Sequence, residues 1–214
     1  MKDILVPIDF SIYSLSAAKA AAAIAGYSGG TIHLLHIADI PVGWDKQPAK
    51  IKQEYPLLEE RLMNAKARLE KFSQLQTFKN RSTISHVLGG VPFEQINIFA
   101  KRKKIDLIIM GVHGAGDSDL KFIGSTAQRV MRTAPSPVLG VKKSFNLGGL
   151  KKIFFASDFD EDVSTAINIV KNLAYDLRAN IDLAFINTPS NFVDDITMEA
   201  RMRPRLSRRR PRNR

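Results

Sequence analysis

The chain has 214 residues, of which 44% are hydrophobic and 25% are charged. This length suits one full domain with a further fragment, or two small domains, and the ordinary composition excludes a wholly disordered or fibrous chain. The absence of cysteine excludes disulfides, thiolate catalysis and cysteine-ligated metal sites. The four histidines have no metal-binding spacing, so we expect no metal site built from side chains alone.

The positive charge is concentrated at one end of the chain. The formal net charge is +11, and residues 201–214 hold eight arginines and no acidic residue, so residues 1–200 carry only +3 (11 − 8). We expect residues 200–214 to be a disordered tail. Nucleic acid is therefore an expected partner only through this tail, and no segment is long and apolar enough to span a membrane. Residues 4–8 are too short for the core of a signal peptide, which predicts a cytoplasmic protein.

The first half of the chain alternates between strand and helix signals. Residues 4–8 are a short apolar run that predicts a buried strand. An alanine-rich helix follows over residues 11–27, with a serine at its start and glycines after its end. Residues 31–37 predict a second strand, and residues 38–50 a loop because they contain proline and glycine. Apolar residues at spacings of three and four predict an amphipathic helix over residues 57–72.

The same alternation continues in the second half of this region. Residues 82–88 predict a third strand, and residues 92–103 a helix with one apolar face. Residues 105–110 are almost all apolar and predict a central strand. After a glycine-bearing loop, residues 125–133 predict a helix that two prolines end, and residues 138–141 predict a fifth strand.

This order of elements predicts the fold class. Strands that alternate with helices form a parallel sheet with helices on both faces, so we expect an α/β, Rossmann-like fold with a five-stranded parallel sheet. Ligands of such sheets bind beyond the carboxyl ends of the strands. Asp9, residues 37–40 and residues 111–125 should therefore lie along one edge of the sheet.

A weak internal repeat extends beyond the first five strands. A shift of 149 residues aligns residues 2–37 with residues 151–186 without a gap, and nine of the 36 positions are identical. The chain thus predicts one complete unit over residues 1–143, a linker over 144–150, and a partial second copy (β-α-β) over 151–199. The partial copy has no counterpart to the later strands of the first unit.

The loop that follows the central strand carries the clearest functional signal. Gly111, Gly114 and Gly124 are followed by Ser125 and Thr126, in the pattern G-x2-G-x9-G-[ST]. Glycines allow the backbone to approach a phosphate closely, and the free amides of a helix N-terminus attract an anion. The alternative interpretation is an ordinary strand-to-helix turn.

Together these motifs resemble the universal stress protein family. The resemblance covers essentially all of residues 1–143, and its matching segments are Val6–Phe10, His36–Ile37, Val87–Pro92, Ile108–Gly114 and Gly124–Ser125. Residues 151–186 resemble the opening of the same family. The resemblance implies an adenine nucleotide α-hydrolase-like fold in the tandem form, with a truncated second domain.

ATP-binding members of that family hold the phosphates and ribose with the glycine loop, and the nucleoside with residues at the ends of the first two strands. The resemblance therefore implies a site for ATP with Mg²⁺ that contains Pro7, Ile8, Asp9, Ile37, Met110, Gly111, Gly114, Gly124, Ser125 and Thr126. Asp9 has an alternative role at the start of a helix, where its carboxylate would accept backbone amides.

Two positions depart from the family pattern. Val112 stands where a small hydroxyl residue is frequent, and Ala115 where a basic residue often follows, which weakens the expected phosphate contacts. The second copy keeps Asp158 but has no glycine loop, so we expect it not to bind nucleotide.

These residues predict an ATP-binding stress-response or signalling module. No paired base and nucleophile is visible, so we expect no catalytic residue and at most slow ATP hydrolysis. The alternatives are a nucleotide-independent, dimeric interaction protein of the same fold, or a related α-hydrolase, which would need glycines after the first strand. In this family the fifth strand often pairs with a partner, so we expect a homodimer through Val138–Val141.

Overall fold

The computed structural model describes residues 1–113, 123–143, 149–157, 159, 163–185 and 192–206. The chain forms two compact units, Met1–Asn146 and Leu147–Arg214, and each is described by itself. Across the described ranges, no helix combines the length and apolar character that crossing a membrane requires. Gly114 and Asp158 lie outside the described residues.

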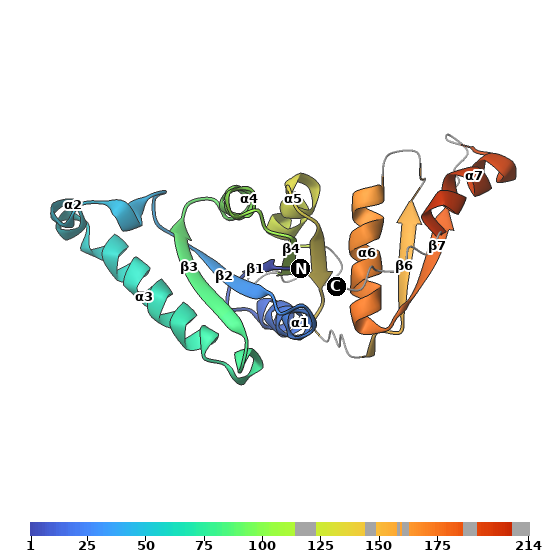
Figure 1. The fold of residues 1–214 in the computed structure, drawn as a ribbon. Coiled ribbons are helices and arrows are strands. Elements are labelled where there is room, and N and C mark those ends of the chain that lie inside the picture. The colour runs from blue at the N-terminus through green and yellow to red at the C-terminus, as the bar shows by residue number, and fades with distance from the viewer. Residues whose placement is uncertain (114–122, 144–148, 158, 160–162, 186–191, 207–214) are drawn as a thin grey trace. The chain divides into compact units, whose positions relative to one another are not determined.

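The first unit is built around one five-stranded sheet (Figure 1). The strand order is β3-β2-β1-β4-β5, and every neighbouring pair is parallel. The strands are β1 (Asp3–Pro7), β2 (Thr31–Ala38), β3 (Ser82–Gly89), β4 (Leu107–Gly111) and β5 (Val138–Val141). The predicted α/β fold with a five-stranded parallel sheet is confirmed.

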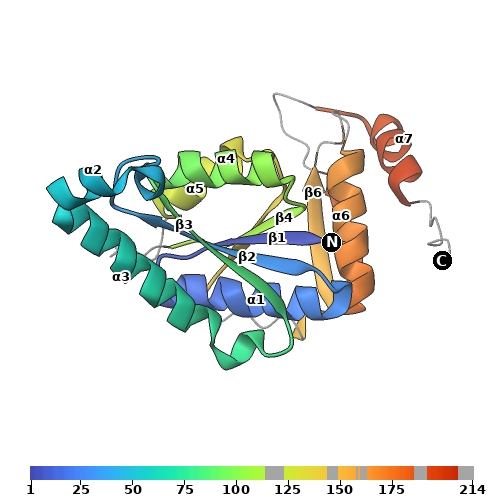
Figure 2. The same cartoon turned by 60° about the vertical axis from the view of Figure 1, so that its left-hand side comes forward.

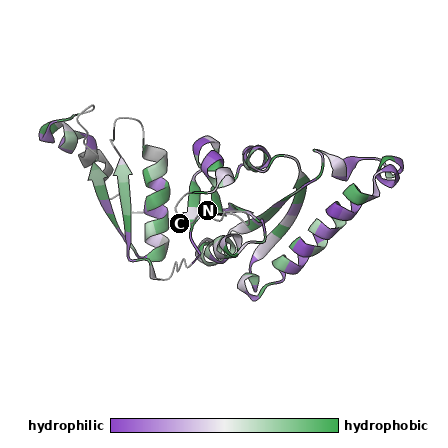
Figure 3. Cartoon of the chain, turned by 180° about the vertical axis from the view of Figure 1, so that it is seen from behind, coloured by the Kyte–Doolittle hydropathy of each residue, from purple (hydrophilic) through white to green (hydrophobic). Residues whose placement is uncertain are grey.

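Helices cover both faces of this sheet, α4 and α5 on one face and α1 and α3 on the other (Figure 2). These helices are α1 (Ile12–Ser28), α3 (Pro56–Ser73), α4 (Pro92–Lys103) and α5 (Ser125–Thr133). The central strand β1 is apolar after Asp3 because it is covered from both sides, and its residues Ile4, Leu5 and Val6 are fully buried. Figure 3 shows that α3, in contrast, has hydrophilic and hydrophobic residues along its length.

The turn between β1 and α1 brings polar groups to the carboxyl edge of the sheet. Ser11 is the N-cap of α1, and its side chain accepts a hydrogen bond from the amide of Ser14. Phe10, just before the cap, has a left-handed φ of 63°, which makes the turn tight. Gly29 ends the helix with φ 69°, a conformation that glycine adopts without strain.

Three short elements of the first unit were not expected from the sequence. A 3₁₀ turn, η1 (Trp44–Lys46), lies within the region predicted as a loop over 38–50, and helix α2 (Ala49–Glu54) begins at the end of that region and continues past it. Helix α2 contains no buried residue, so it has no apolar periodicity that could reveal it. A second 3₁₀ turn, η2 (Gln76–Phe78), follows α3.

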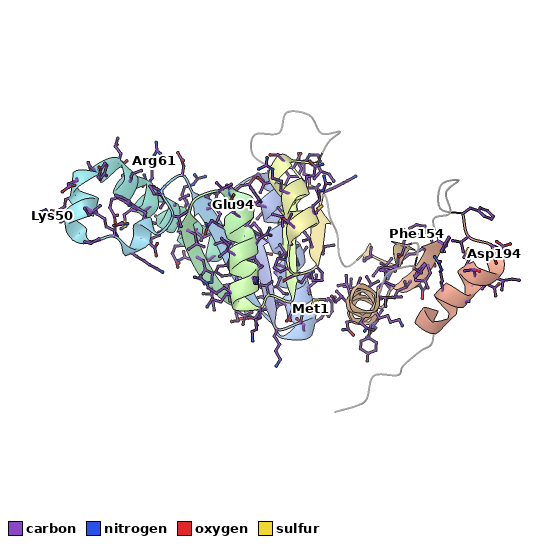
Figure 4. All side chains as sticks on the ribbon, turned by 90° about the horizontal axis from the view of Figure 1, so that it is seen from above. Met1, Lys50, Arg61, Glu94, Phe154 and Asp194 are labelled. Atoms are coloured by element: carbon purple, nitrogen blue, oxygen red, sulfur yellow. The ribbon has the colours of Figure 1, made fainter. Side chains whose placement is uncertain are left out.

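The second unit contains β6 (Lys152–Ser157), α6 (Ser164–Leu177), β7 (Asn180–Phe185) and α7 (Asp195–Leu206). Helix α7 continues past residue 200, where the sequence predicted a disordered tail, so that expectation is wrong for residues 201–206. Residues 207–214 lie outside the described residues. On β6, Phe154 is 68% exposed (Figure 4).

The geometry of the second unit repeats that of the first at the offset found in the sequence. In β1 and β2, Asp3 pairs with Thr31, and in β6 and β7 the residues 149 positions later, Lys152 and Asn180, form the corresponding parallel pair. The left-handed residues also recur, because Phe10 corresponds to Phe159. The second sheet has two parallel strands and follows the same β-α-β order.

Candidate functional site

A cavity of about 420 Å³ opens at the carboxyl ends of β1, β2 and β4. It lies where the sheet order changes direction, between β1 and β4, which is the usual ligand position in open α/β sheets. Nine of the ten predicted site residues line it: Pro7, Ile8, Asp9, Ile37, Met110, Gly111, Gly124, Ser125 and Thr126. The tenth, Gly114, is outside the described residues.

The first wall of the cavity comes from the turn after β1. The amide of Ile8 donates to the carbonyl of Leu35 over 2.8 Å, which holds this turn against the end of β2. Asp9 is exposed, and its Oδ1 accepts the amide of Ser11 over 2.9 Å. The helix-start role considered for Asp9 is thus present in part, although the capping side chain is Ser11 itself.

The opposite wall is the N-terminus of α5. Gly124 is the N-cap with φ −58° and ψ 145°, and no side chain caps this helix end. The first intrahelical hydrogen bond runs from the Gln128 amide to the Gly124 carbonyl. The amides of the first turn, before Gln128, therefore have no carbonyl acceptor within the helix. Ser125 and Thr126 of that turn line the cavity. This helix start therefore offers partial positive charge to a ligand.

One hydrogen bond closes the base of the glycine loop. The Gly124 amide donates to the Val112 carbonyl over 2.8 Å, and the Val112 amide donates to the Val141 carbonyl over 3.1 Å. The two ends of the segment that contains residues 114–122 are thereby held together beside the cavity.

Gly111 has a packing role that the sequence did not predict. A Cβ atom at this position would lie 2.6 Å from the Cβ of Tyr13 and 2.9 Å from its carbonyl carbon. Only glycine fits here without displacing the start of α1. The glycine pattern therefore reflects close packing between β4 and α1 as well as any contact with a ligand.

The floor of the cavity is apolar and belongs to the main core. Sequence reasoning missed Leu35, Ile96 and Ala127, which line the cavity and are all less than 4% exposed. Strand and helix periodicity marks such residues as core, and only the strand register shows which of them reach the carboxyl edge. An apolar floor with a few polar groups at the rim is typical of a small-molecule site.

Two histidines also line the cavity. His36 Nδ1 donates to the Ile8 carbonyl over 2.7 Å, and its ring packs 4.6 Å from the ring of Phe10. Burial lowers the pKa of His36, so the neutral ring is favoured. His113 packs against Tyr13, and its Nδ1 is buried without a hydrogen-bond partner in the described structure.

The charge of the cavity is low. Asp9 is the one acidic side chain among its described lining residues, and these include no lysine or arginine. The described residues also contain no group of three side chains that could hold a metal ion. An anionic ligand would therefore depend on backbone amides, hydroxyl groups and any cation that it brings with it.

Comparisons with known proteins agree with this fold. Residues 1–142 match the model of the universal stress protein family. A universal stress protein of Methanocaldococcus jannaschii is 36% identical over 146 residues, which cover 66% of this chain and 82% of that protein. A Coxiella burnetii homologue is 30% identical over 144 residues, which cover 65% of this chain and 95% of that protein.

Solved structures extend the similarity. A second Methanocaldococcus jannaschii protein has a TM-score of 0.57 and 27% identity, over 68% of this chain and 98% of its own. A Pseudomonas aeruginosa structure has a TM-score of 0.62 and covers 96% of this chain and 67% of its own, but its 19% identity shows a likeness of fold alone. The family match and the curated relatives show that the chain belongs to the universal stress protein family.

Proposed function

We propose that this protein is an ATP-binding universal stress protein that acts as a stress-response or signalling module. The observation that carries the proposal is the single cavity that joins the Asp9 turn, the end of β2 and the N-terminus of α5. In ATP-binding members that this sequence resembles, the corresponding residues hold the nucleoside and the phosphates. A bound adenine nucleotide would therefore lie across the carboxyl edge of the sheet.

The residues of the cavity fit the parts of such a ligand. The apolar floor around Ile37 and Met110 suits a base, and the amides at the start of α5 suit a phosphate group. Asp9 lies at the rim, where its carboxylate can accept hydrogen bonds from ribose hydroxyl groups. Gly114, whose backbone we also assign to the phosphates, remains an expectation from the sequence.

Mg²⁺ would enter with the phosphates. Magnesium sites in proteins commonly use one or two carboxylates together with substrate phosphates and water. The cavity offers the carboxylate of Asp9 and the hydroxyl groups of Ser125 and Thr126, which are oxygen donors of the kind that Mg²⁺ accepts. The ion would neutralise part of the phosphate charge, because the described lining residues include no lysine or arginine that could do so.

Hydrolysis by this site should be slow. The described lining residues place Asp9 in a hydrogen bond with the Ser11 amide and His36 in one with the Ile8 carbonyl. The described lining residues also include no lysine or arginine that could stabilise the charge that develops on the phosphate in the transition state. We therefore propose that bound ATP stays unhydrolysed for much longer than one catalytic cycle of an efficient ATPase.

The oligomeric state and the second unit are also proposals. Strand β5 lies at the edge of the sheet and is a candidate for pairing with the same strand of a second chain. Light scattering should report a dimer, and Leu139→Lys should shift it toward monomer. We further propose that the second unit is a partial copy in a tandem arrangement, which its register and the fold likeness over 96% of the chain support.

The experiment that tests ATP binding exploits the start of α5. Ser125 is the first residue of the helix, where proline is well tolerated, and Gly124 already has the extended backbone that a residue before proline prefers. Ser125→Pro removes one amide donor and the hydroxyl, whereas the control Ser125→Ala removes only the hydroxyl. We expect calorimetry with ATP and Mg²⁺ to show an affinity about tenfold lower for Ser125→Pro than for Ser125→Ala.

Two outcomes would count against the proposal. Equal affinities in these variants would mean that no phosphate contacts the amide of residue 125. Absence of binding to the folded wild-type protein would favour the alternative function, a dimeric interaction protein that works without nucleotide.

A further inference from the structure

Three polar side chains form a hydrogen-bonded chain across β1, β2 and β3. Asp3 Oδ1 lies 2.9 Å from His33 Nε2, and His33 Nδ1 lies 3.1 Å from His86 Nε2. His33 is only 5% exposed, and none of the three residues lines the cavity. At the Asp3 end of this hydrogen-bonded chain, the Asp106 carboxylate accepts a hydrogen bond from the backbone amide of Asp3 over 3.1 Å.

The chemistry of the acceptor assigns the protons along this chain. An ionised Asp3 can only accept, so His33 donates through Nε2–H. A neutral His33 then has a lone pair on Nδ1, and His86 donates its Nε2–H to it. If His33 takes up a proton instead, it donates from both nitrogens, to Asp3 and to His86. The chain therefore accommodates one proton between the two rings without losing a hydrogen bond.

Protonation of both rings is different. Each of the two facing nitrogens, His33 Nδ1 and His86 Nε2, would then carry a hydrogen, and neither could accept. Two cationic rings would also stand with centroids 5.3 Å apart. The contact between β2 and β3 would change from a hydrogen bond to a repulsion.

Residues of α4 increase the penalty for a positive charge on His86. The Phe99 ring lies 4.7 Å from the His86 ring, and the same helix carries Arg102 and Lys103. Burial is the largest of the effects that together lower the pKa of His86 to about 4, and the charges of His33, Lys103 and Arg102 account for the rest.

The second unit holds a different pair at the equivalent position. The residues 149 positions after Asp3 and His33 are Lys152 and Asp182, whose Nζ and Oδ2 lie 2.8 Å apart. This pair also joins neighbouring strands, but it consists of a lysine and an aspartate and contains no histidine. The histidine chain is therefore a property of the first unit and is not required for pairing strands of this fold.

Strand β3 is the element that such a change would release. It lies at the edge of the sheet and pairs with β2 alone, from Ser82 to Gly89. We propose that the Asp3–His33–His86 chain is an acid-sensitive latch, which keeps its hydrogen bonds with one added proton and loosens edge strand β3 with the second.

Amide hydrogen exchange of the full-length protein, measured between pH 7 and pH 5, tests this proposal. The measured quantity is the exchange rate of β3 amides relative to that of β4 amides, after correction for the intrinsic pH dependence of exchange. A pKa change from 6.5 to about 4 would raise this ratio at most about twentyfold between pH 7 and pH 5. We expect a rise of several-fold, because solvent screens the partly exposed ring.

Variants separate the latch from a general effect of acid. His86→Gln retains an amide donor for His33 Nδ1 but does not titrate, so the ratio should stay constant with pH. The control His36→Gln, on β2, removes a histidine bonded to the backbone and should keep the acid rise. Lys103→Gln should raise the pKa of His86 and so make the rise smaller.

The proposal fails if the wild-type ratio does not change with pH, or if its acid rise persists in His86→Gln. Should His86→Gln not fold, Lys103→Gln decides the question, since an undiminished rise in that variant overturns the latch. Nitrogen-15 NMR spectra of the imidazole rings give a second readout, because they show which ring nitrogen carries the proton. At pH 7 they should show His86 protonated at Nε2, and protonation at Nδ1 instead would contradict the assigned chain.

Discussion

Substitution of Gly111 by alanine tests whether packing explains one glycine of the loop pattern. The added Cβ would approach the Cβ of Tyr13 to 2.6 Å, the Tyr13 carbonyl carbon to 2.9 Å and the His113 carbonyl oxygen to 3.2 Å. The first two distances are too short for carbon atoms in contact. Tyr13 belongs to the first turn of α1, so β4 and α1 must separate to admit the methyl group.

The expected loss of stability follows from the cost of overfilling a packed interior. Such substitutions typically destabilise a protein by about 1–3 kcal/mol, because neighbouring backbone has to move. For a domain of this size, we expect a decrease of about 3–9 °C in the unfolding temperature. Displacement of α1 would also move the turn that carries Asp9, so nucleotide affinity should fall with stability.

Denaturant unfolding of the purified protein measures the change, with Gly124→Ala as the control. Gly124 has φ −58° and ψ 145°, a conformation that alanine adopts readily, so that variant should lose less than about 1 kcal/mol. A Gly111→Ala protein as stable as Gly124→Ala would refute the packing argument. It would leave contact with a ligand as the reason for glycine at this position.

Three further results are expected. The pKa of His86 is 6.5 in the unfolded and about 4 in the folded protein, so the stability that neutral His86 contributes is complete above pH 6.5 and is lost as the pH falls toward 4. Over this pH range the unfolding free energy of the wild type should therefore fall about 1–2 kcal/mol more than that of His86→Gln, after allowance for solvent screening. Parallel curves of unfolding free energy against pH would contradict this. Ser16→Ala removes a hydroxyl 2.6 Å from the Lys143 carbonyl and should lower the unfolding free energy by about 1 kcal/mol in urea titrations, whereas no change would show that water replaces this bond. Asp9→Asn keeps an acceptor for the Ser11 amide but removes the charge, so calorimetry should show weaker nucleotide binding at unchanged stability; unchanged affinity would remove the carboxylate from the site.

The sequence predicted the sheet well because its signals are local. The strands β1, β4 and β5 are mainly apolar and β2 and β3 mix apolar with polar residues, and each observed strand lies within about two residues of its predicted bounds. Helix α2 was missed because it buries no residue and therefore leaves no apolar period. Helix α7 extends to Leu206 although its last turns are rich in arginine, a composition that suggested disorder.

The cavity was only partly predictable. Topology places the Asp9 turn and the start of α5 at one edge, and the resemblance to a family selects residues there. The packing role of Gly111 required the distance to Tyr13, which no sequence spacing reveals. The chain from Asp3 through His33 to His86 depends on the registers of two strand pairs, so three distant residues gave no signal before the fold was known.

The most direct test of the central claim is a calorimetric titration of the full wild-type chain with ATP and Mg²⁺. Because the glycine pattern and the cavity belong to the first unit, we expect saturable binding with one ATP per chain. Binding of two ATP molecules per chain would contradict the assignment of the site to the first unit alone. No binding by a folded protein would contradict the proposed function itself.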